Sequence, residues 1–257
     1  MNILLTNDDG ICSDGLLKLA EALRSIGHHK VTVVAPDINR SGISHALSIL
    51  NNPVKISLLR EDSWSCSGFP AECIIIALKN LLPKSPDLVL SGINHGANLG
   101  TDLIYSGTAA AARQASLAGI PAIALSLVAS ENYFWDMAAS WTTGHLEELL
   151  SYWSENTFVN VNIPNISSGP EGIIPSWPAI KAYKDTLAVM TTLDGSRFCF
   201  LEAGEEKTEN EAGSDCDVVA RNFVSVSTVY NYPAVIREFC PRAPDYAAVA
   251  SRIGKKG

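Results

Sequence analysis

Apolar residues follow strand and helix spacings in turn from the start of the chain. Residues 3–5 form a short apolar run, and residues 15–27 carry apolar side chains at helical spacing: Leu16, Leu19, Ala20, Leu23 and Ile26. Gly27 is typical of the residue just after a helix. Residues 31–35 are a second apolar run, closed by Pro36. This order predicts a βαβ unit, in which the two strands are parallel.

The same alternation continues as far as residue 163. It predicts helices at residues 72–82, 108–117 and 138–153, and strands at residues 88–90, 122–127 and 158–163. Strands that alternate with helices are typical of a sheet with mainly parallel strands. We therefore expect an α/β fold with a Rossmann-like, mainly parallel sheet flanked by helices.

The pattern changes after Pro164. Short β-like segments at residues 187–192, 198–201 and 223–229 predict β-hairpins attached to the core. Between them, residues 202–217 contain seven acids and one lysine, which predicts a solvated loop. We expect a single domain over residues 1–257, with a core over about 1–165 and a β-rich C-terminal region over about 166–257.

Composition narrows the class of protein. Apolar residues make up 47% of the 257 positions and charged residues 18%, as in globular proteins. The net charge of -8 argues against a broad nucleic-acid surface or an anionic-membrane surface. No signal peptide or membrane-length apolar run is recognisable, so we expect a cytoplasmic protein. The six cysteines form no Cys-x-x-Cys motif and are expected to be buried free thiols: Cys12, Cys66, Cys73, Cys199, Cys216 and Cys240.

Two adjacent carboxylates, Asp8 and Asp9, follow the first predicted strand and precede Gly10. At about 4 Å and an effective dielectric near 20, their repulsion is roughly 4 kcal/mol. An Asp-Gly pair is also a hairpin turn signal, although the next segment is helical here. The pair therefore fits either a water-screened turn or a site for a hard divalent cation such as Mg²⁺ or Mn²⁺.

Two further strand ends carry polar residues, and ligands of open parallel sheets bind beyond the carboxyl ends of the strands. One end contains Ser41, which is consistent either with an ordinary polar loop or with a binding site. The other contains Asn94, which can supply a neutral amide oxygen. The glycines at 92, 96 and 100 do not have the spacing of the dinucleotide-binding fingerprint.

A candidate anion site begins at Ser106, Gly107 and Thr108, before an alanine-rich helix. Free N–H groups and a partial positive charge make a helix N-terminus suitable for phosphate. An ordinary capped helix is the alternative. Acids, oxygen donors and this helix start all fall on one edge of the predicted sheet, which favours a functional site.

These segments resemble the SurE family of survival-protein 5′/3′-nucleotidases. The matching stretches are residues 3–11, 34–37, 39–42, 68–73, 91–94, 98–100, 104–111, 160–164 and 223–227. The chain departs from the family pattern at Ala97, where proline is common, and at Thr228 and residues 230–233. These departures lie outside the expected metal ligands.

The resemblance implies a metal-dependent phosphomonoesterase that acts on nucleoside 5′-monophosphates, with 3′-monophosphates left open. It implies one divalent ion per subunit, Mg²⁺ or Mn²⁺, with Ca²⁺ able to occupy the site. The implied metal ligands are Asp8, Asp9, Ser41 and Asn94, and the implied phosphate contacts are Asn94, Ser106, Gly107 and Thr108. It also implies a homodimer or homotetramer assembled through the C-terminal region.

The expected catalytic residues are Asp8 and Asp9. Attack by metal-bound water is favoured over direct attack by Asp9, because adjacent acids differ from the Asp-x-Asp of haloacid-dehalogenase-type phosphatases. His45 and His95 are candidate proton donors, although a lone loop histidine more often has a structural role. The alternative function is a regulatory protein that binds nucleotide or metal without turnover.

Overall fold

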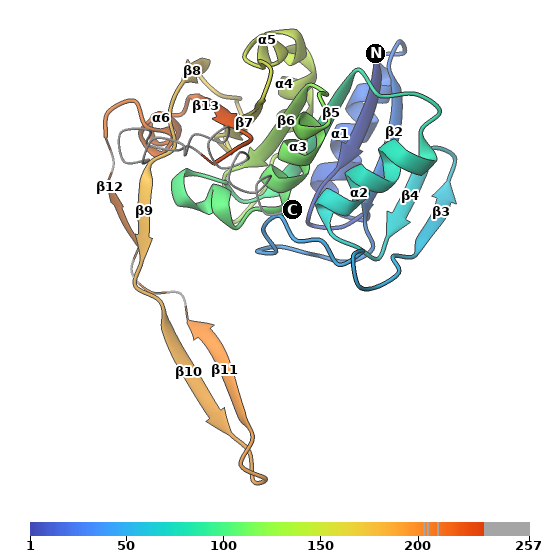
Figure 1. Cartoon of the computed structure of the whole chain (residues 1–257). Coiled ribbons are helices and arrows are strands. Elements are labelled where there is room, and N and C mark those ends of the chain that lie inside the picture. Colours follow the sequence, from blue (N-terminus) through green and yellow to red (C-terminus); the bar gives the residue numbers. More distant parts are fainter. Residues whose placement is uncertain (203, 205, 210, 234–257) are drawn as a thin grey trace, which may run out of the picture.

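A computed structural model describes residues 1–233 of the chain, apart from 203, 205 and 210. Nine strands of this part form one sheet (Figure 1). In spatial order they are β3 (Ile56–Arg60), β4 (Ser63–Cys66), β2 (Lys30–Pro36), β1 (Asn2–Thr6), β5 (Leu88–His95), β6 (Ala122–Leu127), β7 (Thr157–Ile163), β13 (Val224–Tyr230) and β8 (Ile173–Pro175).

Six neighbouring strands run parallel to one another: β4, β2, β1, β5, β6 and β7. On the two sides of this group, β3 runs antiparallel to β4, and β13 runs antiparallel to β7. The predicted α/β fold with a mainly parallel sheet is therefore confirmed. Strand β1 pairs with β2 on one side and with β5 on the other, so the chain order reverses between β1 and β5. Such a switch point is where ligands bind in open parallel sheets. Thr6, the last residue of β1, pairs with Ser91 in the middle of β5, so the end of β1 lies beside the second half of β5.

Helices cover both faces of the sheet. One face holds α1 (Asp14–Ser25), α4 (Trp135–Gly144) and α5 (Leu146–Ser151), and the other holds α2 (Pro70–Ile76), the π-helix η1 (Ala77–Leu81) and α3 (Gly107–Leu117). Successive strand side chains point to opposite faces. Accordingly, Leu5 packs in the core beneath α1, and Leu4 packs in the core beneath α2 and α3.

Helix α1 follows the predicted periodicity, since Leu16, Leu19, Ala20 and Leu23 are all buried. Gly27 then adopts a φ of +81°, the left-handed conformation that favours glycine after a helix. The prediction of one helix over residues 138–153 was wrong, because α4 ends at Gly144 and α5 begins at Leu146. Between them His145 leaves the helical region at a φ of -113°, next to glycine, a poor helix former.

The C-terminal region contains the predicted hairpin. Strands β10 (Thr186–Thr191) and β11 (Arg197–Glu202) pair antiparallel and project far from the body of the molecule (Figure 1). Residues 223–229 do not form a second hairpin, because β13 enters the main sheet between β7 and β8. The boundary expected near residue 165 stays a prediction.

The expectation of a solvated loop over residues 202–217 was wrong. Strand β12 (Glu206–Glu209) pairs antiparallel with β9 (Ile180–Tyr183), and α6 (Asp215–Ala220) follows. Asp215 is fully buried and accepts hydrogen bonds from the N–H groups of Gly100 and Ala179. Backbone donors thus replace water around this carboxylate, which a count of charges along the sequence does not register.

No disulfide joins the cysteines of the described residues. Cys66 and Cys73 are buried as expected, but Cys12 and Cys199 are exposed and Cys216 is half-buried, so the expectation was wrong for these three. Cys240 lies outside the described residues. None of the helices in the described part combines the length and apolar character needed to cross a membrane.

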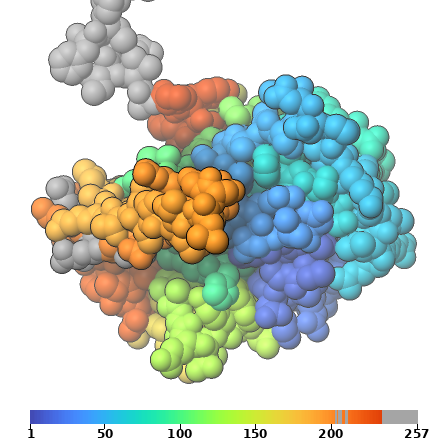
Figure 2. Space-filling model, turned by 90° about the horizontal axis from the view of Figure 1, so that it is seen from below, coloured from blue at the N-terminus to red at the C-terminus, as the bar shows by residue number. Residues whose placement is uncertain are grey.

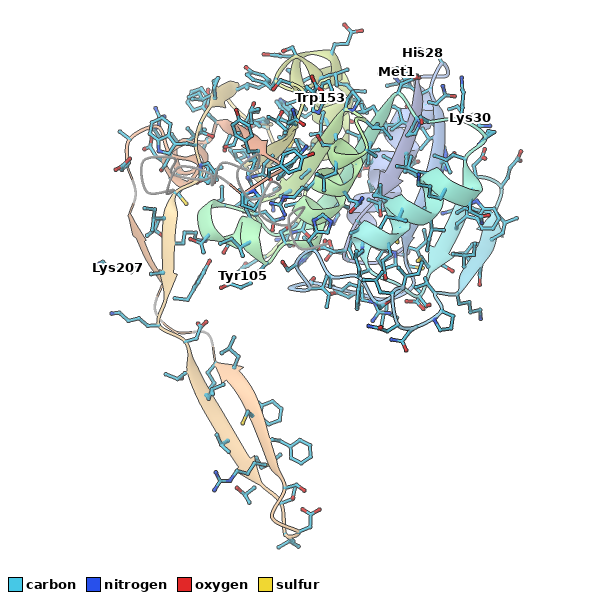
Figure 3. The ribbon with its side chains drawn as sticks, viewed as in Figure 1. Met1, His28, Lys30, Tyr105, Trp153 and Lys207 are labelled. Atoms are coloured by element: carbon cyan, nitrogen blue, oxygen red, sulfur yellow. The ribbon has the colours of Figure 1, made fainter. Side chains whose placement is uncertain are left out.

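The two ends of the parallel strands lie at opposite edges of the body. Met1 and Lys30 mark the edge where β1 and β2 begin, and Tyr105 lies at the other edge, just before α3 (Figure 3). The β10–β11 hairpin projects from the Tyr105 side (Figures 1 and 3). Figure 2 views this side, with the hairpin directed toward the reader.

Candidate active site

Asp8 follows the end of β1 and is only 3% exposed. Its Oδ1 accepts a hydrogen bond of 2.5 Å from the hydroxyl of Thr108, and its Oδ2 accepts one of 3.1 Å from the Thr108 backbone N–H. Burial raises the pKa of Asp8 and the charge of Asp9 adds to this, while the bonds from Thr108 oppose it. The carboxylate is thus held in one orientation at the start of α3.

Asp9 is half-buried beside Asp8. Its Oδ2 accepts a hydrogen bond of 2.9 Å from the backbone N–H of His95, and its Oδ1 lies 3.4 Å from the amide nitrogen of Asn39. Burial raises the pKa of Asp9, and the bond from His95 opposes that rise. Within the described residues, no lysine or arginine forms an ion pair with either carboxylate. No described lysine or arginine therefore offsets the repulsion expected from the sequence, and the side-chain charge that opposes the rise in the pKa of Asp9 is that of His95.

An irregularity in β5 directs the side chain of Asn94 toward Thr108. The pairing of β5 with β6 shifts register between Ser91 and Asn94, as at a β-bulge, which re-aims side chains. Gly92 within the shift has a φ of +137°, and a Cβ there would lie 2.3 Å from the carbonyl oxygen of Leu125. The Oδ1 of Asn94 lies 3.4 Å from the Thr108 hydroxyl, so Thr108 touches both Asp8 and Asn94.

The loop after β2 is tied to the same edge. The N–H of Arg40 donates a hydrogen bond of 2.6 Å to the backbone carbonyl of Asp8. Ser41 is exposed, and its N–H donates to Oδ1 of Asn39 at 2.8 Å. Ser41 is thus connected to the carboxylates through its neighbours Asn39 and Arg40. Gly10, with a φ of +104°, allows the close approach, because a Cβ there would lie 3.1 Å from the carbonyl carbon of Ile38.

The start of α3 packs directly on Asp8. Ser106 caps the helix, because its hydroxyl oxygen accepts the N–H of Ala109 at 3.0 Å. A Cβ on Gly107 would lie 2.8 Å from Cβ of Asp8 and 2.9 Å from its Oδ2. Glycine is therefore needed for this contact. Both donors of Thr108 are used on Asp8, which makes it an orienting residue here, and its direct contact with phosphate stays a prediction.

The two candidate histidines have different surroundings. A ring nitrogen of His45, Nε2, lies 2.9 Å from the side-chain oxygen of Gln114 on α3. The ring of His95 instead stacks on Tyr133, with centroids 4.1 Å apart, and lines a cavity that also includes Asp9. His95 is therefore the better placed of the two for a ligand at the carboxylates.

The cavity beside Asp9 has a volume of about 630 Å³. Its lining includes Asn39 as well as Tyr133 and Trp135 from the segment between β6 and α4. The sequence reasoning missed these three residues. Tyr133 and Trp135 follow the carboxyl end of a parallel strand, so the rule that selected the other strand ends would have indicated them.

The donor set at this edge fits a hard cation. No group of three or more histidine, cysteine, aspartate or glutamate side chains that could hold a metal occurs in the described part of the chain. A metal here would therefore combine the two carboxylates with the neutral oxygens of Asn94 and Ser41. All-oxygen sets of this kind suit Mg²⁺, Mn²⁺ and Ca²⁺ better than softer metals.

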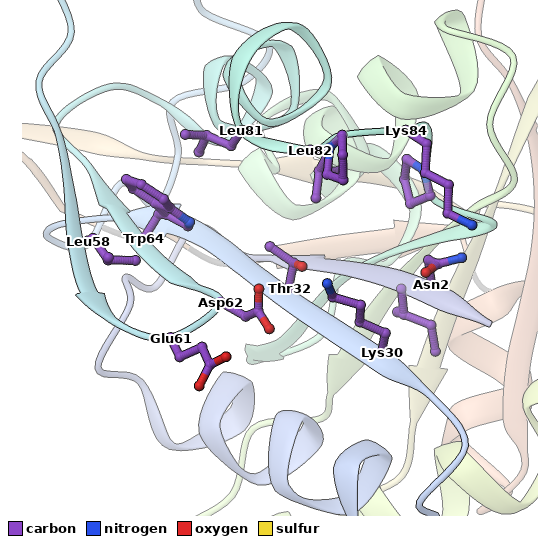
Figure 4. A pocket seen from close by; sticks show the side chains of 13 residues that line it. Asn2, Lys30, Thr32, Leu58, Glu61, Asp62, Trp64, Leu81, Leu82 and Lys84 are labelled. Carbon is purple, nitrogen blue, oxygen red and sulfur yellow. The ribbon is translucent and has the colours of Figure 1, made fainter.

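A second cavity of about 450 Å³ opens at the amino ends of the strands (Figure 4). Figure 4 shows apolar side chains such as Leu58, Trp64 and Leu82 around it, together with Lys30 and Asp62. None of the predicted site residues lines this cavity. The predicted site residues thus all lie away from this cavity.

Known proteins are similar to this chain in both sequence and fold. Residues 3–179 match the family described as survival protein SurE. The chain is 40% identical over 237 residues to the 5′-nucleotidase SurE of Pelobacter propionicus, covering 90% of this chain and 93% of the relative. It is 37% identical over 235 residues to that of Synechococcus sp., covering 88% and 90%. The crystal structure of the SurE protein from Aquifex aeolicus superposes with a TM-score of 0.81 at 34% identity, covering 96% of this chain and 100% of that one.

Proposed function

This chain belongs to the SurE family, and on that premise we propose that it is a 5′-nucleotidase that hydrolyses nucleoside monophosphates with the aid of a divalent cation. The relatives named 5′-nucleotidase SurE support the activity. The proposal rests on one observation: at the switch point between β1 and β5, Thr108 contacts both Asp8 and Asn94. Oxygen donors and a helix N-terminus there suit a phosphate ester and its counterion.

Asp8, Asp9, Ser41 and Asn94 would hold one Mg²⁺ or Mn²⁺ ion per subunit, and Ca²⁺ fits the same oxygens. The support is electrostatic, since two carboxylates with raised pKa values lie together without an ion-pair partner in the described residues. When bound, a divalent cation supplies positive charge for phosphate oxygens and acidifies water in contact with it. Thr108, His95 and Asn39 keep the carboxylates oriented for that purpose.

We propose water as the nucleophile rather than Asp9. The oxygens of Asp9 already accept from His95 and Asn39, which orients the carboxylate as a ligand. In the reaction the bond between phosphorus and the nucleoside oxygen breaks, and a bond between phosphorus and the water oxygen forms. One water proton reaches the leaving oxygen, giving nucleoside and inorganic phosphate. Ser106 keeps its hydroxyl proton for a phosphate oxygen, because only its oxygen is used in capping α3.

Phosphate release from 5′-AMP and 3′-AMP tests the proposal, measured with EDTA and again after Mg²⁺ or Mn²⁺ is added back. We expect EDTA to abolish release and the divalent ions to restore it. Full activity in EDTA would contradict the metal requirement. No release from a panel of nucleotides with any ion would favour a regulatory protein that binds nucleotide without turnover.

We also propose that the protein is a homodimer or homotetramer assembled through the C-terminal region. The β10–β11 hairpin stands clear of the body, and a lone two-stranded hairpin is marginally stable in water. Its apolar side chains are exposed: Leu187 by 62%, Val189 by 54%, Phe198 by 51%, Phe200 by 53% and Leu201 by 71%. A second copy of the chain would cover this surface.

A further inference from the structure

Three aromatic rings cluster beside Asp9. The ring centroid of Tyr133 lies 4.1 Å from that of His95 and 4.9 Å from that of Trp135, with interplanar angles of 26° and 12°. The centroids of His95 and Trp135 are 6.1 Å apart. Because the backbone N–H of His95 donates to Asp9, the cluster begins at a residue that touches the proposed metal ligands.

The rings line the cavity of about 630 Å³ that also includes Asp9 and Asn39. This volume is in the usual range of small-ligand sites. Trp135 is supported from behind by α1, since a Cβ on Gly15 would lie 2.9 Å from its ring. The cavity therefore extends from the proposed metal ligand Asp9 to a supported aromatic surface.

The charges around the cavity limit what the aromatic end can bind. Among the residues that the structure describes, its lining includes the acids Asp9, Asp14 and Glu131 and no lysine or arginine. A second phosphate group would be repelled there, whereas a neutral aromatic ring can stack on the side chains. The exposed side chains of Glu131 and Asn132 offer hydrogen-bond acceptors to the amino groups of such a ring.

We infer that His95, Tyr133 and Trp135 form the base-binding subsite and that they favour purine over pyrimidine nucleoside monophosphates. The inference rests on the proposed nucleotidase function. In a nucleotide whose phosphate lies at a cation held by Asp9, the base is the aromatic group left to bind, and base–aromatic stacking contributes substantially to binding. A purine favours this surface because its fused rings bury more area than a single pyrimidine ring.

The test compares Tyr133→Leu with the wild-type protein on AMP, CMP and ribose 5-phosphate, which has no base. We expect kcat/KM for AMP to fall by about 10- to 100-fold, the usual effect of removing one stacking ring. Hydrolysis of ribose 5-phosphate should fall much less than that of AMP, and the preference for AMP over CMP should shrink. An equal loss on AMP and ribose 5-phosphate would overturn the inference, as would no loss at all.

Two variants serve as controls. Phe134→Leu changes the aromatic residue between Tyr133 and Trp135, which does not line the cavity and is 39% exposed, so it should leave all three substrates unaffected. Tyr133→Phe keeps the ring and should retain the AMP preference. A loss in Phe134→Leu equal to that in Tyr133→Leu would show a general effect on the segment and would overturn the inference.

Equilibrium binding of adenosine separates this inference from the proposed function. Adenosine should bind the wild-type protein and bind Tyr133→Leu about 10-fold or more weakly. If no substrate is hydrolysed and this difference persists, the nucleotidase proposal fails while the subsite stands. Equal adenosine binding by both proteins would overturn the subsite even if AMP is hydrolysed.

Discussion

The hydroxyl of Thr108 donates a 2.5 Å hydrogen bond to Oδ1 of Asp8, although the two residues are 100 positions apart. The bond joins the end of β1 to the first turn of α3. Since Asp8 is almost fully buried, its orientation depends on this contact and on the backbone N–H of the same threonine. Thr108 is thus a positioning residue for a proposed metal ligand.

Replacing Thr108 with valine should therefore misorient Asp8. The side chain keeps its shape but loses its only donor, and an unsatisfied buried carboxylate oxygen costs about 1–3 kcal/mol. We expect kcat/KM for AMP to fall about 10-fold or more and the affinity for Mn²⁺ to weaken. Thr108→Ser keeps the hydroxyl and should stay near the wild-type values. Identical kinetics for the valine and serine variants would show that the hydroxyl has no such role.

Gly107→Ala should displace Asp8 from the start of α3. The added Cβ would lie 2.8 Å from Cβ of Asp8, closer than real contacts allow, and 3.1 Å from Pro70. A shift of about 1 Å in a catalytic group can reduce the rate about 100-fold. The matched control is Gly144→Ala, because a Cβ on Gly144 would have no atom of the described residues within 4 Å. Steady-state kinetics of both variants measure the difference, and wild-type activity in Gly107→Ala would contradict the packing argument.

Asp8→Asn should remove most of the metal-dependent hydrolysis. The amide is neutral, so the site loses half of its carboxylate charge, and the loss of metal chemistry worth several kcal/mol lowers kcat/KM by at least about 100-fold. Calorimetric titration with Mn²⁺ should show weaker binding, while the circular dichroism spectrum stays unchanged. Full activity in this variant would exclude Asp8 as a ligand.

The control for Asp8→Asn is the same change at Asp87. That carboxylate lies at the opposite edge of the sheet, where it accepts hydrogen bonds from the backbone N–H and side chain of Asn2. Asp87→Asn should leave Mn²⁺ binding and hydrolysis unaffected. A loss of metal binding there would show that the effect at Asp8 is not specific to the site.

Negative charges introduced on the β10–β11 hairpin should weaken the assembly of subunits. Phe198 and Phe200 lie two positions apart on β11, so they point to the same face of the hairpin, and their cross-strand partners are Met190 and Ala188. The double variant Phe198→Asp/Phe200→Asp should therefore have a lower mass by light scattering than the wild-type protein, because buried carboxylates would be unpaired in the assembly.

The control on the same hairpin is Thr191→Asp. Thr191 pairs across the strands with Arg197, so a new carboxylate there has an opposite charge beside it. This variant should keep the wild-type mass. If the double phenylalanine variant also keeps that mass, the hairpin is not the assembly surface.

Strands β1, β2, β5, β6 and β7 and helices α1, α2 and α3 could be predicted because each depends on local periodicity, whereas β3 and β4 were not predicted. Leu16, Leu19, Ala20 and Leu23 are apolar at helical spacing, and the same side chains are buried beneath α1. The division of residues 138–153 into α4 and α5 could not be predicted in this way, since apolar residues continue across the break at His145. The burial of Asp215 was also hidden, because its donors, Gly100 and Ala179, are distant in sequence.

The sequence by itself determined which polar residues would gather at one edge of the sheet. Parallel strands end on the same side, so Asp8, Asp9, Ser41 and Asn94 were expected at one edge of the sheet once the βαβ order was recognised. Only the tertiary structure decided how they are oriented. The register shift in β5, the contact between Gly107 and Asp8, and the Tyr133 ring against His95 all arise between segments far apart in the chain. Side-chain direction depends on packing across such segments, and periodicity within one segment carries no information about it.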